Sequence, residues 1–72
     1  MEEIQTQSLQ AIATVSGLLI SGLVPGEDFH IYNLQGQLFY KGKAVTSEQH
    51  VRLRDQGIYI ITTGDKTVKA IY

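Results

Sequence analysis

The amino-acid sequence predicts a small all-β domain, a compact antiparallel sandwich of six or seven short strands. Runs rich in Ile, Val, Phe and Tyr recur along the chain, and turn signals containing Gly, Pro, Asn or Asp separate them. The chain has 72 residues and no cysteine, so it forms one domain at most, without disulfide bonds. Because a core of this size offsets chain entropy only narrowly, we expect a module of something larger, or one that docks on a partner, rather than a free-standing machine.

The first part of the chain predicts two strands after a flexible lead-in over residues 1–8. We expect the strands at residues 11–15 and 18–23 of the single domain, which covers residues 9–72. A helical turn or two over residues 9–15 is the alternative. A signal peptide is not expected, because Glu2 and Glu3 occupy the place of a basic segment and polar residues interrupt the apolar run.

The clearest element is a hairpin over residues 28–41, DFHIYNLQGQLFYK. We expect a type I turn from Asn33 to Gly36, with Gly36 in the left-handed position of a bulge. A two-residue loop at Gln35-Gly36 is the alternative. The preferred turn pairs Asn33 with Gln37, Ile31 with Phe39, and Phe29 with Lys41.

This register predicts the two faces of the hairpin, since a slip of one residue would exchange them. Phe29, Ile31 and Phe39 would share one face. The other face would be a possible partner surface of four residues: His30, Tyr32, Leu38 and Tyr40.

Turn signals define the remaining elements. Pro25 and Gly26 predict a type II turn over residues 24–27, and a polar loop is expected over residues 43–49. Residues 50–54 then predict a strand with Val51 and Leu53 pointing inward and Arg52 and Arg54 pointing outward.

The last two runs, residues 57–63 and 66–72, predict a closing hairpin across the two-residue loop Gly64-Asp65. Both of its faces carry apolar residues, so we expect a central pair or one covered by another domain. The expected pairs are Ile61 with Val68 and Tyr59 with Ala70.

The charge of the chain argues against nucleic acid and against an anionic membrane as the main partner. The net charge is −1, and we expect no membrane insertion. Residues 1–36 contain four acids and no Lys or Arg, whereas residues 37–72 contain six bases and three acids. The first interpretation is a solvated surface on which the acidic half of the chain and the basic half attract each other in the fold. The second is that the C-terminal half forms a weakly basic face that binds a partner.

No residue cluster predicts a reaction, so we expect a non-catalytic protein with no metal and no cofactor. His30 and His50 lack the spacing of metal ligands. The adjacent carboxylates of Glu27 and Asp28 are better explained as solvated groups at the start of a strand than as an acid/base pair.

Three motifs, in their order and spacing, resemble the C-terminal sorting domain of the type IX (Por) secretion system of Bacteroidetes. The similar stretch covers about residues 18–72, and it lacks the Pro-Asn-Pro opening of many family members. The motifs are Ile31-Tyr32-Asn33 with Gly36-Gln37, then Leu53 with Gly57-Ile58-Tyr59-Ile60-Ile61, then Lys66-Thr67-Val68-Lys69.

The resemblance implies an immunoglobulin-like sandwich, the C-terminal module of a larger secreted protein, that directs this protein to secretion or the cell surface. Its partners would be proteins, either the secretion apparatus or upstream domains of the same chain, and a weak homodimer through edge strands is also expected. The alternative is an interaction module that docks on neighbouring domains of a surface or glycan-handling protein. The recognition residues implied by the resemblance are Gly57, Tyr59, Lys66, Thr67 and Lys69.

Overall fold

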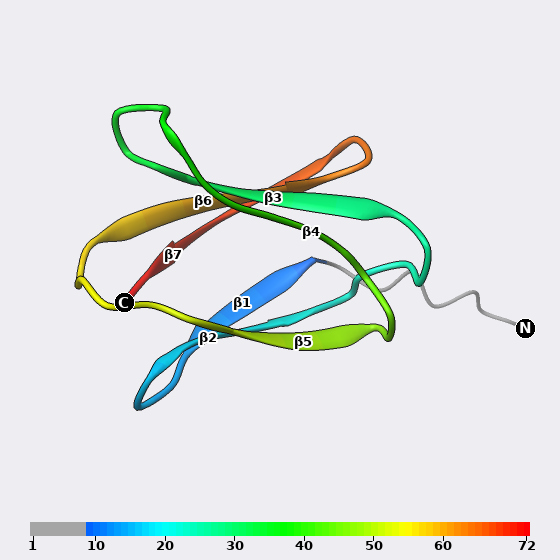
Figure 1. Ribbon diagram of the computed structural model, residues 1–72, viewed down its shortest axis with the longest axis horizontal. Coiled ribbons are helices and arrows are strands. Elements are labelled where there is room, and N and C mark those ends of the chain that lie inside the picture. The colour runs from blue at the N-terminus through cyan, green and yellow to red at the C-terminus, as the bar shows by residue number, and fades with distance from the viewer. Residues whose placement is uncertain (1–8) are drawn as a thin grey trace, which may run out of the picture.

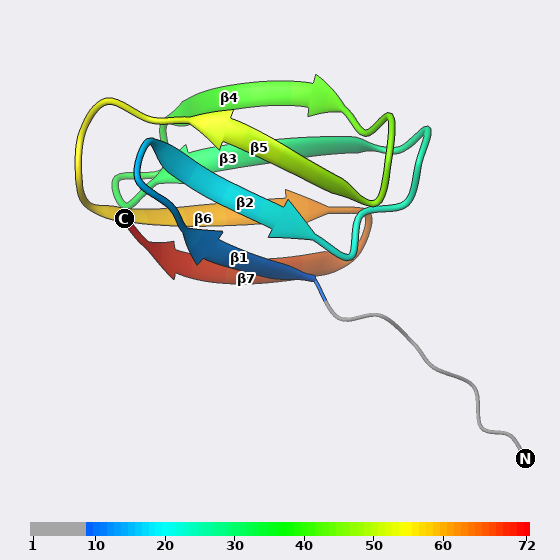
Figure 2. The same ribbon diagram turned by 90° about the horizontal axis from the view of Figure 1, so that it is seen from below.

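The structure, a computed structural model, describes residues 9–72 as a sandwich of two antiparallel sheets (Figure 1, Figure 2). The predicted all-β sandwich is therefore confirmed, whereas the expected lead-in lies outside the described residues. The described part of the chain contains seven strands: β1 (Gln10–Ala13), β2 (Gly17–Ser21), β3 (Asp28–Asn33), β4 (Leu38–Lys43), β5 (Glu48–Arg52), β6 (Ile58–Thr63) and β7 (Lys66–Ile71).

The strand order is immunoglobulin-like. One sheet has the order β1-β2-β5 and the other has the order β4-β3-β6-β7. The first, second and fifth strands thus face the third, sixth and seventh, as in immunoglobulin domains. The fourth strand lies in the second sheet, beside the third. Only the pairs β1–β2, β3–β4 and β6–β7 are hairpins, and the other connections cross between the sheets.

The core lies between the two sheets and follows from alternation along the strands. Side chains at alternate positions of a strand point to the same face, so Leu18 and Ile20 face Phe29 and Ile31 across the sandwich. These four side chains and Ile61 are fully buried. Full burial of one such side chain contributes about 1.5–3 kcal/mol.

The first hairpin confirms two expected strands in place of a helical turn. Its turn begins earlier than predicted, because the Thr14 backbone N–H and Oγ1 both donate hydrogen bonds to the carbonyl of Gly17, at 2.8 and 3.1 Å. Gly17 also lies against β5. A Cβ atom at Gly17 would lie 2.0 Å from the carbonyl oxygen of Val51, so no other residue fits there without a backbone shift.

The turn of the central hairpin is confirmed. The backbone N–H of Gly36 donates to the Asn33 carbonyl at 3.0 Å, and Gly36 has a φ of +85°. The Asn33 carboxamide oxygen also accepts a hydrogen bond from the Gln37 N–H at 2.9 Å. The Asn33 backbone N–H donates to the Gln37 carbonyl, which closes the predicted first pair.

The predicted register beyond this turn is wrong by one residue. Ile31 lies opposite Tyr40 rather than Phe39, and Phe29 lies opposite Gly42 rather than Lys41. The ladder shifts between Tyr32 and Ile31, so Phe39 is an extra residue in β4. Such a β-bulge on an edge strand bends the strand and redirects its side chains.

The bulge corrects the predicted faces. The ring of Tyr40 lies 5.7 Å from that of Phe29, and the ring of Phe39 lies 5.5 Å from that of Tyr59, so both side chains approach residues of the core. Tyr40 therefore does not belong to the expected partner surface. Tyr32 remains there, with His30 and Leu38.

The remaining turns agree with the sequence. The Glu27 N–H donates to the Val24 carbonyl at 3.0 Å, and Gly26 has a φ of +96°, as a type II turn requires. The strand predicted from residue 50 begins two residues earlier, at Glu48. Its expected burial holds, because Val51 and Leu53 are buried. The closing hairpin has the predicted register, with Ile61 opposite Val68 and Tyr59 opposite Ala70.

Candidate functional site

The closing strand β7 is the element on which the resemblance places recognition, and it is an edge strand. In the described part of the chain it pairs with β6 alone. Its other side lies near β1 of the opposite sheet (Figure 2). An edge strand presents unpaired backbone N–H and C=O groups, which another chain can pair with.

The five implied residues fall into two groups. Thr67 and Lys69 are exposed on β7, and Lys66 is half-buried at its first position. A partner could therefore contact the side chains of Thr67 and Lys69 and the exposed part of the Lys66 side chain. Gly57 and Tyr59, in contrast, hold the closing hairpin together.

Tyr59 is buried, with 5% of its surface exposed. Its hydroxyl donates a hydrogen bond of 2.7 Å to the carbonyl of Asp55, which fixes the turn before β6. Burial raises the pKa of Tyr59 above the usual 10.0, and the nearby Asp55 and Tyr72 raise it further. Tyr59 therefore positions the turn and contributes no surface of its own.

Gly57 ties the end of the closing strand to the start of β6. Its N–H donates to the Tyr72 carbonyl at 3.2 Å, and the Tyr72 N–H donates to the Gly57 carbonyl at 2.9 Å. The hydroxyl of Tyr72 donates to the carbonyl of Val15 at 3.1 Å, which links this end of β7 to the first hairpin. The C-terminal end of β7 is thereby held in place.

The structure brings the two predicted sites together on one surface, which we call the outer face. Residues directly opposite each other in a sheet point to the same side. One row across the four strands contains Leu38, Tyr32, Ile60 and Lys69, and the next contains Lys41, His30, Thr62 and Thr67.

The outer face therefore joins the expected partner surface on β3 and β4 to the residues on β7 for which the resemblance implies recognition. The rings of His30 and Tyr32 stack at 6.1 Å, and Leu38 is 53% exposed. Ile60, the link between the two sites, was not among the predicted site residues. Its alternation with buried Tyr59 and Ile61 was the signal that could have identified it.

Among residues 9–72, no three His, Asp or Glu side chains gather closely enough to hold a metal ion. The same residues include no helix that could span a membrane.

No family model and no curated protein matches this sequence. A solved structure does match: that of PorZ from Porphyromonas gingivalis, described as an essential bacterial surface component of the type IX secretion system. The TM-score is 0.68 at 23% sequence identity, and the alignment covers 78% of this chain. It covers 9% of the PorZ chain, so the present chain matches a small part of that protein. The two chains share this sandwich fold.

Proposed function

We propose that this chain is a non-catalytic sorting or anchoring module that directs a larger protein to secretion or the cell surface. The observation that carries the proposal is that a fold shared with part of a type IX secretion component occurs here with the ordered motifs of a sorting domain. The match to 9% of the PorZ chain supports a module rather than a complete machine.

Recognition would occur at β7 and the adjoining part of the outer face. The secretion apparatus would pair with the free edge of β7 and contact Thr67 and Lys69, which are both exposed. Before that encounter, Lys69 would discourage pairing between copies, since charged residues on edge strands oppose aggregation.

An export assay tests this proposal. The 72-residue chain is fused behind a fluorescent protein that carries a signal peptide, and the fusion is expressed in a Bacteroidetes host with an intact type IX apparatus. Deleting residues 66–72 would also remove Val68 and Ala70, which pack on the core, so point variants are more informative. We expect Thr67→Asp with Lys69→Glu to abolish export of a folded fusion.

Lys43→Glu is the matched control. Lys43 is exposed on β4, at the opposite edge of the same sheet. This variant should be exported like the parent. If the parent, the Thr67→Asp/Lys69→Glu variant and the Lys43→Glu variant were exported equally, recognition would not involve Thr67 or Lys69.

The outer face favours one alternative function, docking on a neighbouring domain of a surface or glycan-handling protein. Stacked His30 and Tyr32 beside exposed Leu38 provide aromatic and apolar area of the kind found at protein interfaces. Under this alternative, Tyr32→Ala weakens docking to the adjacent domain and leaves reporter export unchanged. Under the sorting proposal, Lys69→Glu reduces export.

A further inference from the structure

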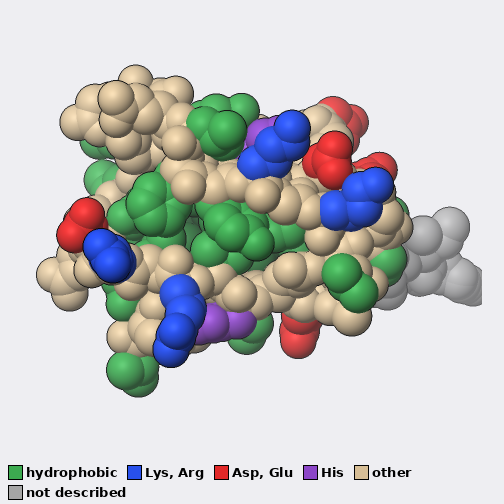
Figure 3. All heavy atoms as spheres, viewed as in Figure 1, with side chains coloured by type: hydrophobic (Ala, Val, Ile, Leu, Met, Phe, Trp, Pro, Cys, Tyr) green, Lys and Arg blue, Asp and Glu red, His purple; other side chains and the backbone are tan. Residues whose placement is uncertain are grey.

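The sandwich is open along the side where β4 and β5 form the edges of the two sheets. On the opposite side β1 contacts β7 of the other sheet (Figure 2). Between β4 and β5, hydrophobic side chains lie uncovered in the middle of the molecular surface, and charged side chains of both signs surround them (Figure 3). This side is remote from the free edge of β7.

Two hollows adjoin each other here, and Phe39 lines both. The first has a volume of about 490 Å³ and is lined by Ser16, Phe39, Arg52, Leu53 and Arg54. The second, of about 330 Å³, lies between the turn after β3 and the loop before β6. We call the first hollow the β4/β5 slot.

The β-bulge of β4 builds the apolar wall of this slot. Phe39 is 45% exposed although its ring packs against buried Tyr59, and neighbouring Tyr40 is 38% exposed while resting on Phe29. Each exposed ring is thus supported from behind by a core residue. Rigid aromatic anchors of this kind lose little conformational entropy when a partner binds.

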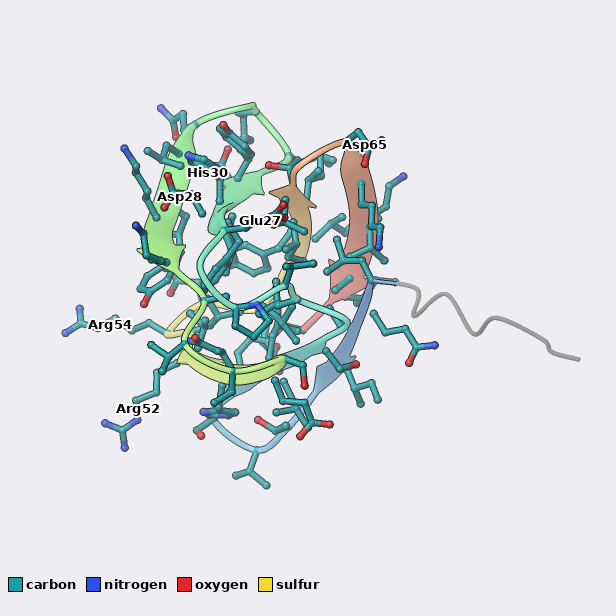
Figure 4. All side chains as sticks on the ribbon, turned by 90° about the vertical axis from the view of Figure 1, so that its right-hand side faces the viewer. Glu27, Asp28, His30, Arg52, Arg54 and Asp65 are labelled. Carbon is teal, nitrogen blue, oxygen red and sulfur yellow. The ribbon has the colours of Figure 1, made fainter. Side chains whose placement is uncertain are left out.

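The basic wall comes from β5 and the residues that follow it. Arg52 and Arg54 project from the same side of the molecule (Figure 4). Arg52 ends β5, Arg54 lies in the bend that follows it, and both line the slot. Neither guanidinium has an ion-pair or hydrogen-bond partner among the described residues. Two unpartnered guanidinium groups lining one hollow can each pair with a carboxylate of another chain.

The charged side chains that line the slot, Arg52 and Arg54, are both cationic. Lys41 and Lys43 lie on β4, and they point to the outer face together with their Cα partners His30 and Asp28. The nearby carboxylates are Asp28, which is the Cα partner of Lys43, and Asp55, which lines the second hollow. If a second copy of the chain bound here through the same edge, its arginines would lie against those of the first copy. Repulsion between these like charges disfavours self-association through this edge.

We propose that the β4/β5 slot binds an extended acidic segment of a partner protein. Its carboxylates would pair with Arg52 and Arg54, and its apolar side chains would contact Phe39 and Leu53, which line the same hollow. This inference goes beyond the sorting function, because it concerns the edge of the sandwich opposite β7.

A peptide titration tests the proposal. The probe is a short fluorescein-labelled peptide of repeated Val-Glu, and the comparison peptide carries Gln in place of each Glu. We expect the Val-Glu peptide to bind the 72-residue chain, to move the amide NMR signals of Ser16, Phe39 and Leu53, and to bind at least about tenfold more tightly than the Gln peptide.

Arg54→Glu should weaken binding of the Val-Glu peptide by at least about tenfold, whereas Lys69→Glu, the same charge change on β7, should leave it unchanged. Both residues are exposed, so both variants are expected to fold. Absence of binding, equal binding of the two peptides, or equal weakening by the two variants would overturn the proposal. So would a concentration-dependent dimer that Arg54→Glu abolishes in sedimentation, because the occupant would then be a second copy.

Discussion

Gly36 shows how far one residue determines its surroundings. Its φ of +85° is a conformation that β-branched residues resist, and the space around its absent Cβ is open. The sequence predicted this position because Asn and Gly in a short turn between two apolar runs have few other solutions. A substitution here therefore tests backbone conformation without a steric clash.

Gly36→Val is expected to lower the free energy of unfolding by at least about 1 kcal/mol, because valine is strained in the left-handed region. Urea denaturation measures the change. Gln35→Val, at an exposed neighbour with ordinary φ, is the control and should be nearly neutral. Equal stability of the two variants would mean that the turn differs from the one described.

Tyr59 gives a second test at this scale, through pH. Its folded-state pKa is raised above 10.0, first by burial and then by Asp55 and Tyr72. A group with a raised folded pKa contributes stability that is complete below its unfolded pKa and is lost as the pH rises through the folded value. The parent should therefore lose stability above about pH 10 partly through Tyr59.

Tyr59→Phe should cost about 1 kcal/mol at neutral pH, since the hydrogen bond to Asp55 is lost. Above pH 10 the difference between the variant and the parent should shrink, because phenylalanine does not ionise. Unfolding measured across this range checks both effects. A difference that stays constant with pH would contradict the account of Tyr59.

Among the elements, local signals predicted hairpins well and failed where a distant contact decides. The closing hairpin has the predicted register because Gly64-Asp65 fixes it from the turn outward. The central hairpin has the predicted turn, but the bulge at Phe39 shifts the strand beyond it. Phe39 packs against Tyr59, a contact between residues far apart in the sequence, and no pattern within residues 28–41 contains it.

The bulge predicts an energetic coupling between β4 and β6. Phe39 and Tyr59 form an edge-to-face pair with ring centroids 5.5 Å apart. In a double-mutant cycle with Phe39→Leu and Tyr59→Leu, such a pair should give a coupling of about 0.5–1.5 kcal/mol. The matched cycle combines Leu38→Ala with Tyr59→Leu, and it should show no coupling. If the effects of Phe39→Leu and Tyr59→Leu on the free energy of unfolding simply added, the two rings would not be in contact.

At the scale of the whole molecule, composition and turn spacing were sufficient to predict an all-β sandwich. The order of strands in the two sheets was not predictable in the same way, because β2–β5 and β3–β6 pair residues from distant segments. The outer face was missed for this reason. It becomes one surface only when β6 lies between β3 and β7.

The central claim, that this module directs export, is tested most directly by gain of function. The fluorescent reporter with a signal peptide is expressed with and without the 72-residue chain, in a host with an intact type IX apparatus and in one that lacks it. We expect reporter at the cell surface or in the medium only when both the chain and the apparatus are present. A folded fusion that stays in the periplasm of the intact host would contradict the sorting function and leave only the shared fold.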